Sequence, residues 1–420
     1  MINPRIIYNL GLWLLLPYIF LHLLWRARKQ PEYLKHISER FGFYSMRCDK
    51  PVIWLHTVSV GETRAVASLV QRLRKAYPDH QLLLTHTTPT GRAASEQLYG
   101  DGVLRVYLPY DYPFAVRRFL GHFRPRIGAL LETEIWFNLI HACKAKQIPL
   151  LLLNARLSEK SARGYEHVER LARDALEELA AIAAQTSDDA ARLTALGASN
   201  VSIMGNLKYD IEPPSAMLEL GKQLRDRFGA DRKIFLAAST REGEEALLLE
   251  ALGQTGIPHL LTVIVPRHPQ RFDAVAALLA QRGIRFQRRS GERPVAPETQ
   301  VVLGDSMGEM FAYYAACDLA FIGGSLLPFG GQNLIEACAV GKPVLVGPHT
   351  YNFIQASQFA ITSGAAVRVQ DASELAQTMQ NLFSNPGQME KTGEAGLRFV
   401  SANRGATEQA LLQINRCIIK

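Results

Sequence analysis

The chain alternates short apolar runs with stretches of helical pattern, and this alternation limits the folds that it can adopt. Between Pro51 and about Met204, apolar runs of three to five residues are separated mostly by segments of ten or more residues. Alternation on this scale predicts a parallel β-sheet covered by helices, which is a doubly wound α/β fold. The runs expected to be strands are Val52–Leu55, Leu82–Leu84, Leu104–Leu108, Ile127–Leu131, Leu150–Leu153, Ile182–Ala184 and Val201–Ile203.

The same pattern resumes in the second half of the chain, after the double proline Pro213–Pro214. Two prolines cannot continue a helix and mark a linker. A chain of 420 residues is also long for one hydrophobic core, so two domains are expected. We expect an N-terminal membrane-anchoring helix over 1–30, α/β domains over 31–212 and 213–402, and a packing helix over 403–420.

The N-terminal apolar segment, Ile6–Trp25, contains twenty residues without a charge, enough to cross a bilayer as a helix. The basic residues Arg26, Arg28, Lys29, Lys35 and Arg40 follow it, and only Arg5 precedes it. The positive-inside rule then places the rest of the chain in the cytoplasm. The segment could instead lie in the membrane interface beside anionic head groups, or pack as a buried helix.

The formal net charge of +8 suggests an anionic partner such as a nucleotide, an acidic sugar or an anionic lipid. No dense block of Lys and Arg with interleaved aromatic residues is present, so nucleic acid is not expected as a partner. The five cysteines are far apart and form no metal-type pairs, as in reduced cytosolic proteins.

Glu62 ends the first polar loop, His56–Glu62, directly after the first expected strand. Ligands of parallel α/β sheets bind at the carboxyl ends of the strands, where a carboxylate can act as a general base. Alternatively, Ser59 and Glu62 form a capping box that only starts a helix. Both interpretations remain open at this point, and a helix N-terminus would keep Glu62 ionised but weakly basic.

Two further loops of the first half, and its junction with the second, carry polar side chains. Thr85–Arg92 offers hydroxyls, an imidazole and a guanidinium for an acidic or polyhydroxylated ligand, although an ordinary loop can contain them too. Glu132–Trp136 places two carboxylates at a strand end, which is costly unless they are partnered or hydrated. Lys208 at the junction could meet a phosphate or carboxylate, or could be a solvated lysine of a hinge.

The loops of the second half suit an anion. Arg267 follows an expected strand, and arginine binds phosphate through two parallel hydrogen bonds. Gly304–Met310 is a loop that enters a helix, with free N–H groups. The glycine-rich stretch Asp318–Pro348 combines a strand, a close turn and a helix expected from about Asn333, in which Glu336 could hold ribose hydroxyls. Glycine clusters alone are weak signals.

Taken together, these loops resemble those of the Kdo transferases, which move 3-deoxy-D-manno-octulosonic acid (Kdo) from CMP-Kdo to the lipid A precursor. The resemblance covers almost the whole chain and keeps the family's motif order. It rests on the apolar N-terminal segment and on HTVSVGE, TTPTG, LLETEIW, GNLKYD, STREGEE, PRHPQRF, GDSMGEM, FIGGS and GGQNLIEACAVGKPVLVGP.

This resemblance implies a GT-B fold of two Rossmann-like domains facing a cleft, with the acceptor on the N-terminal side and the nucleotide on the C-terminal side. It implies Glu62 as catalytic base, with Glu132 and Lys208 supporting the transition state. The implied CMP-binding residues are Arg267, His268, Met307, Gly308, Glu309, Asn333, Leu334, Ile335 and Glu336, and the acceptor-side candidates are Ser59, Thr88 and Arg92.

The expected partners are CMP-Kdo, the lipid A precursor (lipid IVA) and an anionic membrane surface, with the catalytic domains on the cytoplasmic face of the inner membrane. No D-x-D motif is present, and a monophosphate leaving group has little need of a divalent cation, so we expect metal-independent transfer without a cofactor. Two alternatives are a soluble sugar-nucleotide 2-epimerase of GT-B type and an inactive membrane-anchored binding protein.

Overall fold

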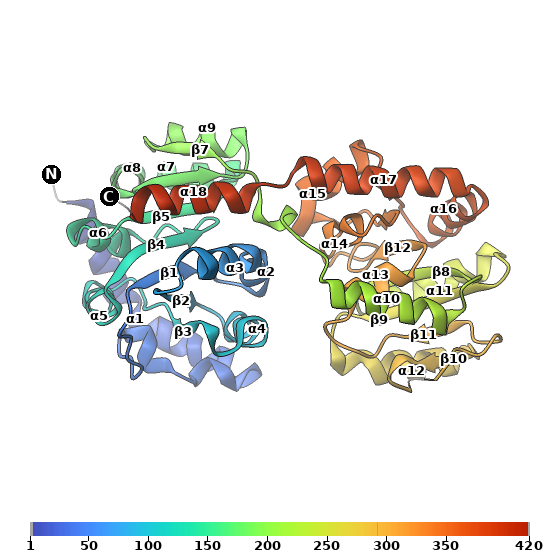
Figure 1. The fold of residues 1–420 in the computed structure, drawn as a ribbon. Coiled ribbons are helices and arrows are strands. Elements are labelled where there is room, and N and C mark those ends of the chain that lie inside the picture. Colours follow the sequence, from blue (N-terminus) through green and yellow to red (C-terminus); the bar gives the residue numbers. More distant parts are fainter. Residues whose placement is uncertain (1–2, 292, 419–420) are drawn as a thin grey trace. The chain divides into compact units, whose positions relative to one another are not determined.

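A computed structural model describes residues 3–291 and 293–418 and divides into two compact units. Unit 1 comprises Met1–Asp210 and Arg404–Lys420, and unit 2 comprises Ile211–Asn403. The outermost residues of the expected N-terminal and C-terminal helices (1–2 and 419–420) lie outside the described part of the chain. Figure 1 shows the elements of both units.

Unit 1 contains a parallel β-sheet with strand order β3-β2-β1-β4-β5-β6-β7, seven strands within the described residues. The parallel α/β architecture predicted from the alternating pattern is therefore confirmed. The strands are β1 (Val52–His56), β2 (Gln81–His86), β3 (Leu104–Tyr107), β4 (Pro125–Leu131), β5 (Leu150–Ala155), β6 (Ala181–Ala184) and β7 (Val201–Ile203).

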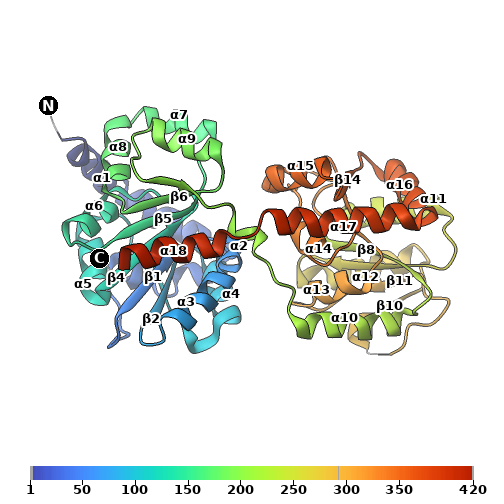
Figure 2. The same ribbon diagram turned by 45° about the horizontal axis from the view of Figure 1, so that its top comes forward.

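Helices cover both faces of this sheet because its strands are apolar on both sides. One core contains residues of α3 and α18, and the other contains residues of α5, α6, α8 and α9. Figure 2 shows α18, the last helix of the chain, lying against the sheet of unit 1. The helices are α2 (Val60–Ala65), α3 (Ala67–Ala76), α4 (Pro89–Tyr99), α5 (Pro113–Phe123), α6 (Phe137–Ala145), α7 (Glu159–Glu166), α8 (Glu169–Glu178), α9 (Ser187–Ala195) and α18 (Ala406–Ile418).

Unit 2 repeats the plan with strand order β10-β11-β9-β8-β12-β13-β14, again seven parallel strands among the residues described. Its strands are β8 (Lys233–Thr240), β9 (Leu260–Pro266), β10 (Phe286–Arg288), β11 (Val301–Leu303), β12 (Leu319–Ile322), β13 (Val344–Val346) and β14 (Ala366–Arg368). Its helices are α10 (Ser215–Phe228), α11 (Glu244–Thr255), α12 (Phe272–Gln281), α13 (Met310–Ala316), α14 (Ile335–Ala339), α15 (Ile354–Thr362), α16 (Ala372–Ser384) and α17 (Pro386–Ala402).

The strand orders locate one topological switch point in each unit, where connections leave neighbouring strands in opposite directions. In unit 1 this point lies between β1 and β4, and in unit 2 it lies between β8 and β12. Ligands of open α/β sheets bind beside the carboxyl ends of the strands at such points.

The apolar N-terminal segment forms α1 (Pro4–Lys29), a helix that contains Pro17. Asn3 caps it by accepting a hydrogen bond from the Arg5 N–H at 3.0 Å. In the described part of the chain, α1 is the one helix long and apolar enough to cross a membrane, with a mean hydropathy of 1.7 over its candidate span. Only 6% of that window is buried, so α1 is not a core helix of unit 1.

Candidate active site

The polar loop after β1 folds back on itself and holds the Glu62 carboxylate at the switch point of unit 1. The Val58 N–H donates to Glu62 Oε2 at 2.7 Å, and the Ser59 hydroxyl donates to Glu62 Oε1 at 2.8 Å. The Glu62 N–H donates in return to Ser59 Oγ at 3.3 Å. The capping box is therefore present. These bonds also fix the carboxylate in one orientation, so the cap and the proposed base are compatible.

Burial raises the pKa of Glu62 above its usual value of 4.5. The hydrogen bond from Val58 opposes this shift, while the negative charge of Glu132 adds to it. Burial outweighs the hydrogen bonds because it penalises the charged form of a carboxyl group. Glu62 is thus a stronger base than a helix N-terminus alone would make it.

Glu132 and Lys208 form an ion pair in unit 1. Lys208 Nζ lies 3.1 Å from Glu132 Oε1, and both side chains are about three-quarters buried. Glu132 follows β4 with a φ of +59°, an unfavourable backbone conformation for a residue with a side chain, of the kind that clusters at functional sites. The structure thus brings together two residues that are 76 positions apart in the sequence.

A chain of amide side chains positions the loop that carries Lys208. Asn154 Oδ1 accepts the Leu207 N–H at 3.0 Å, and Asn154 O accepts a bond from Gln185 Nε2 at 3.0 Å. Asn206 donates to Gln185 Oε1 at 2.9 Å. Asn154 and Gln185 were not singled out by the sequence analysis. Each lies at or directly after the end of a buried strand, and this position in the sequence could have indicated them as candidate site residues.

A buried histidine and a second carboxylate form another contact of unit 1. His56, at the end of β1, is fully buried, and its Nδ1 lies 2.8 Å from Thr85 Oγ1. His56 Nε2 lies 3.7 Å from Glu134 Oε2, which accepts a hydrogen bond from Trp136 Nε1 at 2.7 Å. The LLETEIW loop therefore has partners for both of its carboxylates.

The three acceptor-side candidates take part in local contacts of unit 1. Ser59 caps α2 as described above, and Thr88 caps α4 and donates to the Val58 carbonyl at 2.8 Å. Arg92 donates to the buried Glu39 carboxylate at 2.6 Å. All three lie near the carboxyl edge of the sheet, and their hydrogen bonds also hold its loops in place.

In unit 2, the buried carboxylate of Glu244 joins the loops that follow β8 and β12. It accepts four backbone N–H bonds, from Arg241 at 2.8 Å, Gly324 at 2.5 Å, Ser325 at 2.9 Å and Leu326 at 3.0 Å. Gly324 has a φ of +72°, which favours glycine. The STREGEE and FIGGS motifs are thus parts of one structure at the switch point of unit 2.

A basic cluster follows β9. His268 Nε2 lies 3.3 Å from Arg241 Nη1, and Arg271 forms two hydrogen bonds with the buried Glu245, at 2.6 and 2.9 Å. Partial burial and the charges of Arg241, Arg267 and Arg271 lower the pKa of His268. This positive potential suits a phosphate group.

The SMGE residues lie before α13. Gly308 has a φ of +82° and open space where a side chain would begin, and Met307 is half exposed. Glu309 accepts a hydrogen bond from the Ser306 hydroxyl at 2.6 Å and lies 3.4 Å from Arg289. The loop is therefore ordered by its own side chains while its glycine backbone stays accessible.

The NLIE residues surround the start of α14, which begins at Ile335 rather than at Asn333. Asn333 Oδ1 accepts the Ile335 N–H at 3.1 Å, and Asn333 Nδ2 donates to Glu336 Oε1 at 3.2 Å. Leu334 and Ile335 are buried in the core. Their contribution to a ligand site would therefore come from the backbone, whereas Asn333 and Glu336 offer polar side chains.

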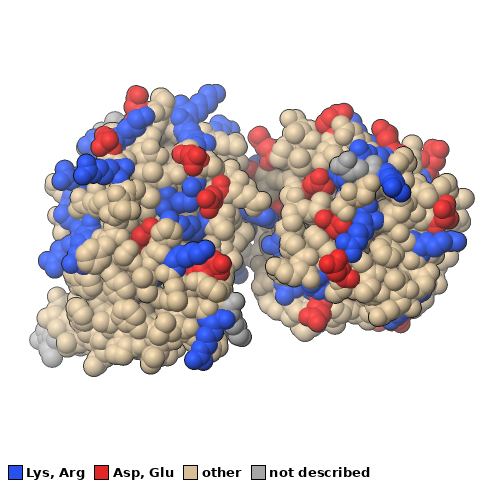
Figure 3. Space-filling model, turned by 90° about the horizontal axis from the view of Figure 1, so that it is seen from below, with Lys and Arg blue, Asp and Glu red and all other residues tan. Residues whose placement is uncertain are grey.

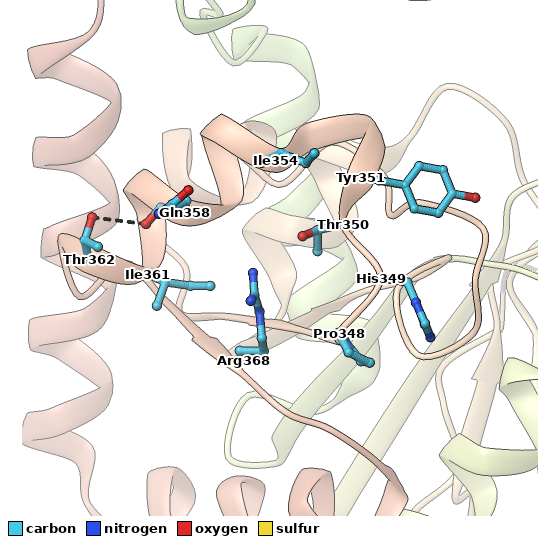
Figure 4. Close-up of a pocket in the computed structure, with 9 residues that line it drawn as sticks. All are labelled: Pro348, His349, Thr350, Tyr351, Ile354, Gln358, Ile361, Thr362 and Arg368. Atoms are coloured by element: carbon cyan, nitrogen blue, oxygen red, sulfur yellow. Dashed lines mark hydrogen bonds between the residues drawn. The ribbon is translucent and has the colours of Figure 1, made fainter. Parts of the chain in front are cut away.

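A cavity of about 420 Å³ adjoins this region and was not predicted from the sequence (Figure 4). The glycine turn packs against its wall, since the Asn352 N–H donates to the Gly330 carbonyl at 3.0 Å. Arg368 at the end of β14 points into the cavity. The lining residues are Pro348, His349, Thr350, Tyr351, Ile354, Gln358, Ile361, Thr362 and Arg368.

Comparison with known proteins decides the family. A family model described as 3-deoxy-D-manno-octulosonic-acid transferase (kdotransferase) matches residues 35–211. The 3-deoxy-D-manno-octulosonic acid transferase of Bordetella pertussis is 42% identical over 423 residues, which cover 97% of this chain and 98% of the relative. The chain belongs to the Kdo transferase family. It is therefore a glycosyltransferase enzyme that transfers Kdo, as the motif order predicted.

Solved structures show the GT-B fold of this Kdo transferase. A glycosyltransferase from Rickettsia africae ESF-5 matches with a TM-score of 0.59 and 16% identity, covering 89% of this chain and 100% of that one. The UDP-GlcNAc 2-epimerase from Neisseria meningitidis matches with a TM-score of 0.60 and 17% identity, covering 87% and 100%. Transferases and epimerases share this fold, so the sequence relationship, not the fold, separates the two classes.

Across residues 3–291 and 293–418, no three His, Cys, Asp or Glu side chains are arranged to hold a metal ion. The catalytic candidates Glu62, Glu132 and Lys208 all belong to unit 1, whereas the CMP-binding candidates all belong to unit 2.

Proposed function

We propose that this Kdo transferase moves Kdo from CMP-Kdo to the lipid A precursor lipid IVA, with Glu62 as general base and without a metal ion. The observation that carries the proposal is the Glu62 carboxylate, which is oriented by two hydrogen bonds and has a raised pKa. A base of this kind removes the proton from a sugar hydroxyl as its oxygen attacks the donor. The C–O bond to CMP breaks in the same step, and CMP leaves as a phosphate monoester.

Unit 2 supplies the features that a CMP-sugar requires. The charges of Arg241, Arg267 and Arg271 act on His268, and Gly308 has open space where a side chain would begin, which together support binding of the CMP phosphate. Preorganised positive charge stabilises a departing phosphate. The helices α13 and α14 are short, so we assign this role chiefly to the side chains rather than to helix dipoles.

Asn333 and Glu336 then bind ribose hydroxyls, and the adjoining cavity receives the acidic sugar. Kdo carries a carboxylate, and the Arg368 guanidinium points into the cavity, which Thr350 also lines (Figure 4). Arginine pairs with carboxylates through two parallel hydrogen bonds. We therefore assign Arg368 to the Kdo carboxylate, a role that the motif comparison did not suggest.

Glu132 and Lys208 support the transition state in this proposal. The ammonium group of Lys208 is held by its carboxylate partner, so its position is defined before substrate binds. The acceptor approaches through the loops of Ser59, Thr88 and Arg92. The enzyme works at the inner membrane with both units on the cytoplasmic face, which agrees with the exposed apolar helix α1 and the basic residues that follow it.

The test uses purified full-length protein in detergent, fresh CMP-Kdo and tetraacylated lipid A precursor, with and without EDTA. Mass spectrometry of the lipid counts the Kdo units added. Transfer at equal rates in both buffers is the expected result. Loss of transfer with EDTA would overturn metal independence, and binding of CMP without any gain in lipid mass would overturn the acceptor assignment.

Two variants separate the base from the helix cap. Glu62→Gln retains an oxygen that accepts the Val58 N–H but cannot take a proton, so we expect kcat to fall by about 10²- to 10⁴-fold. Ser59→Ala removes the cap and one of the two bonds that orient the carboxylate, but keeps the carboxylate itself, so we expect a stability loss of about 1 kcal/mol and a smaller fall in kcat than for Glu62→Gln. If the Glu62→Gln protein were active, Glu62 would have only a structural role, as part of the helix cap.

A further inference from the structure

The helix α1 is attached to unit 1 along its first half by side-chain hydrogen bonds. The Tyr8 hydroxyl donates to Asp111 Oδ2 at 2.9 Å, and Asn138 Nδ2 donates to Asn9 Oδ1 at 2.7 Å. Asp111 is buried and also accepts the N–H groups of Asn138 and Leu139 at the start of α6. Tyr8 and Asn9 of α1 are therefore bonded into the folded unit.

The contacts continue along the rest of α1. The Tyr112 hydroxyl donates to the Leu12 carbonyl at 2.6 Å, and the ring of Phe20 stacks on Phe41 with centroids 5.4 Å apart. Near its end, Leu23 and Ala27 are buried. From residue 5 to residue 27 the attached face extends over about 33 Å of helix, slightly more than the roughly 30 Å of a bilayer's hydrocarbon core.

A helix attached in this way cannot stand across a bilayer while its contacts persist. Unit 1 would then lie beside it at every depth of the hydrocarbon, including the exposed charges of Arg117, Arg118 and Lys144. Charged side chains at that depth are costly. Detaching the helix instead would leave Asp111 without the Tyr8 hydroxyl, and Asn9 would enter the lipid without its Asn138 partner.

The opposite face of α1 is an exposed apolar stripe, defined by Ile7, Leu10, Leu14, Tyr18 and Leu21. These residues recur every three or four positions, so they lie along one side of the helix. All are more than half exposed, and Leu14 is 82% exposed. In Figure 3 the side of unit 1 that carries α1 is a broad area with few charged residues. A continuous row of exposed apolar side chains such as this one marks an interaction site.

We propose that α1 lies flat in the membrane interface, with its exposed stripe inserted into one leaflet and both of its ends on the cytoplasmic side. The partner is an anionic lipid surface, because Arg26, Arg28 and Lys35 are exposed at and after the end of the helix. Trp13, Tyr18 and Trp25 provide the amphipathic rings typical of interfaces. Arg40, expected among these basic residues, is instead buried and donates to the Thr87 carbonyl at 3.0 Å.

This attachment goes beyond the reaction proposed above and does not depend on it. In this arrangement α1 does not cross the membrane, although its length and hydropathy alone would indicate a membrane span. It also places unit 1 directly against the leaflet rather than at the end of a flexible anchor.

The decisive test is the side of the membrane on which the start of α1 lies. Asn3→Cys is introduced after Cys48 and Cys417 are replaced by serine, because the other three cysteines are buried. Cells with a permeabilised outer membrane are treated with a membrane-impermeant maleimide, before or after the inner membrane is opened. We expect labelling only after opening. Labelling of intact inner membranes would show that α1 spans the bilayer and would overturn the proposal.

A binding measurement tests the stripe itself. Leu14→Glu places a charge in the middle of the stripe, and Leu397→Glu is the control at a 48%-exposed leucine of α17 in unit 2. We expect Leu14→Glu to weaken binding to phosphatidylglycerol-containing vesicles by about tenfold or more, with the control unchanged. Equal binding by the two variants would contradict insertion of the stripe. Circular dichroism confirms that both variants are folded.

Discussion

Replacing Glu244 by glutamine should loosen the switch point of unit 2. Its carboxylate is fully buried and accepts four backbone N–H groups, two on each oxygen. In Glu244→Gln an NH₂ group replaces one carboxylate oxygen. The two backbone N–H groups that donated to that oxygen then face another donor and have no acceptor. Each unsatisfied buried donor costs about 1–3 kcal/mol. The two together therefore cost about 2–6 kcal/mol.

Part of this cost is recovered, because burial raises the pKa of Glu244 and the neutral amide escapes that penalty. We expect a net loss of about 2–4 kcal/mol, or about 5–15 °C in the melting temperature of unit 2. Urea and thermal unfolding followed by circular dichroism measure the loss, and calorimetric titration with CMP should show weaker binding.

The exposed neighbour Glu242 provides the control. Glu242→Gln removes the same charge from the same loop without a buried bond, so its stability should change by less than about 0.5 kcal/mol. A loss below about 1 kcal/mol for Glu244→Gln, or equal losses for the two variants, would refute the idea that this carboxylate joins the loops.

Two further predictions concern unit 1. The acidic limb of the kcat/KM profile should lie above pH 4.5, because Glu62 must be deprotonated to act as a base and its pKa is raised. Activity then rises with pH through that pKa. If the Glu62→Gln protein kept the same acidic limb in its pH–rate profile, the limb would belong to another group. Lys208→Met should lower kcat at least about tenfold and cost about 1–3 kcal/mol of stability, because it leaves the largely buried Glu132 carboxylate without its partner. Turnover and thermal unfolding are measured on the same preparation. A fall in stability without a fall in kcat would contradict the prediction.

The apolar runs predicted the strands of unit 1, including the three-residue β7, because a buried parallel strand leaves a continuous apolar segment. They did not predict β10, β11 and β14, which have three residues each. So short a run is common in loops and helices as well. The start of α14 was placed two residues early because the Asn333 side chain turns the backbone before the helix begins.

The motifs named candidate site residues, but they did not predict the environment of those residues. The serine-to-glutamate spacing indicated the capping box, and only the fold revealed the burial that raises the pKa of Glu62. Arg92 was expected on the acceptor side, and its pairing with Glu39, 53 positions away, needed the tertiary structure. Arg368 belongs to no quoted motif, so it could be found only through the cavity that it enters.

The assignment of α18 to unit 1 has a consequence for how the protein is made. The Asp210 carboxylate accepts N–H groups of Gly405 and Thr407, so the point where the chain leaves unit 1 and the point where it returns are bonded together. Ala406, Ala410 and Ile414 then complete a core begun by β1 and α3. During synthesis, unit 2 is translated in full before this helix appears. Unit 2 can therefore fold first as an insertion, while unit 1, although translated earlier, cannot complete this core until α18 has been made.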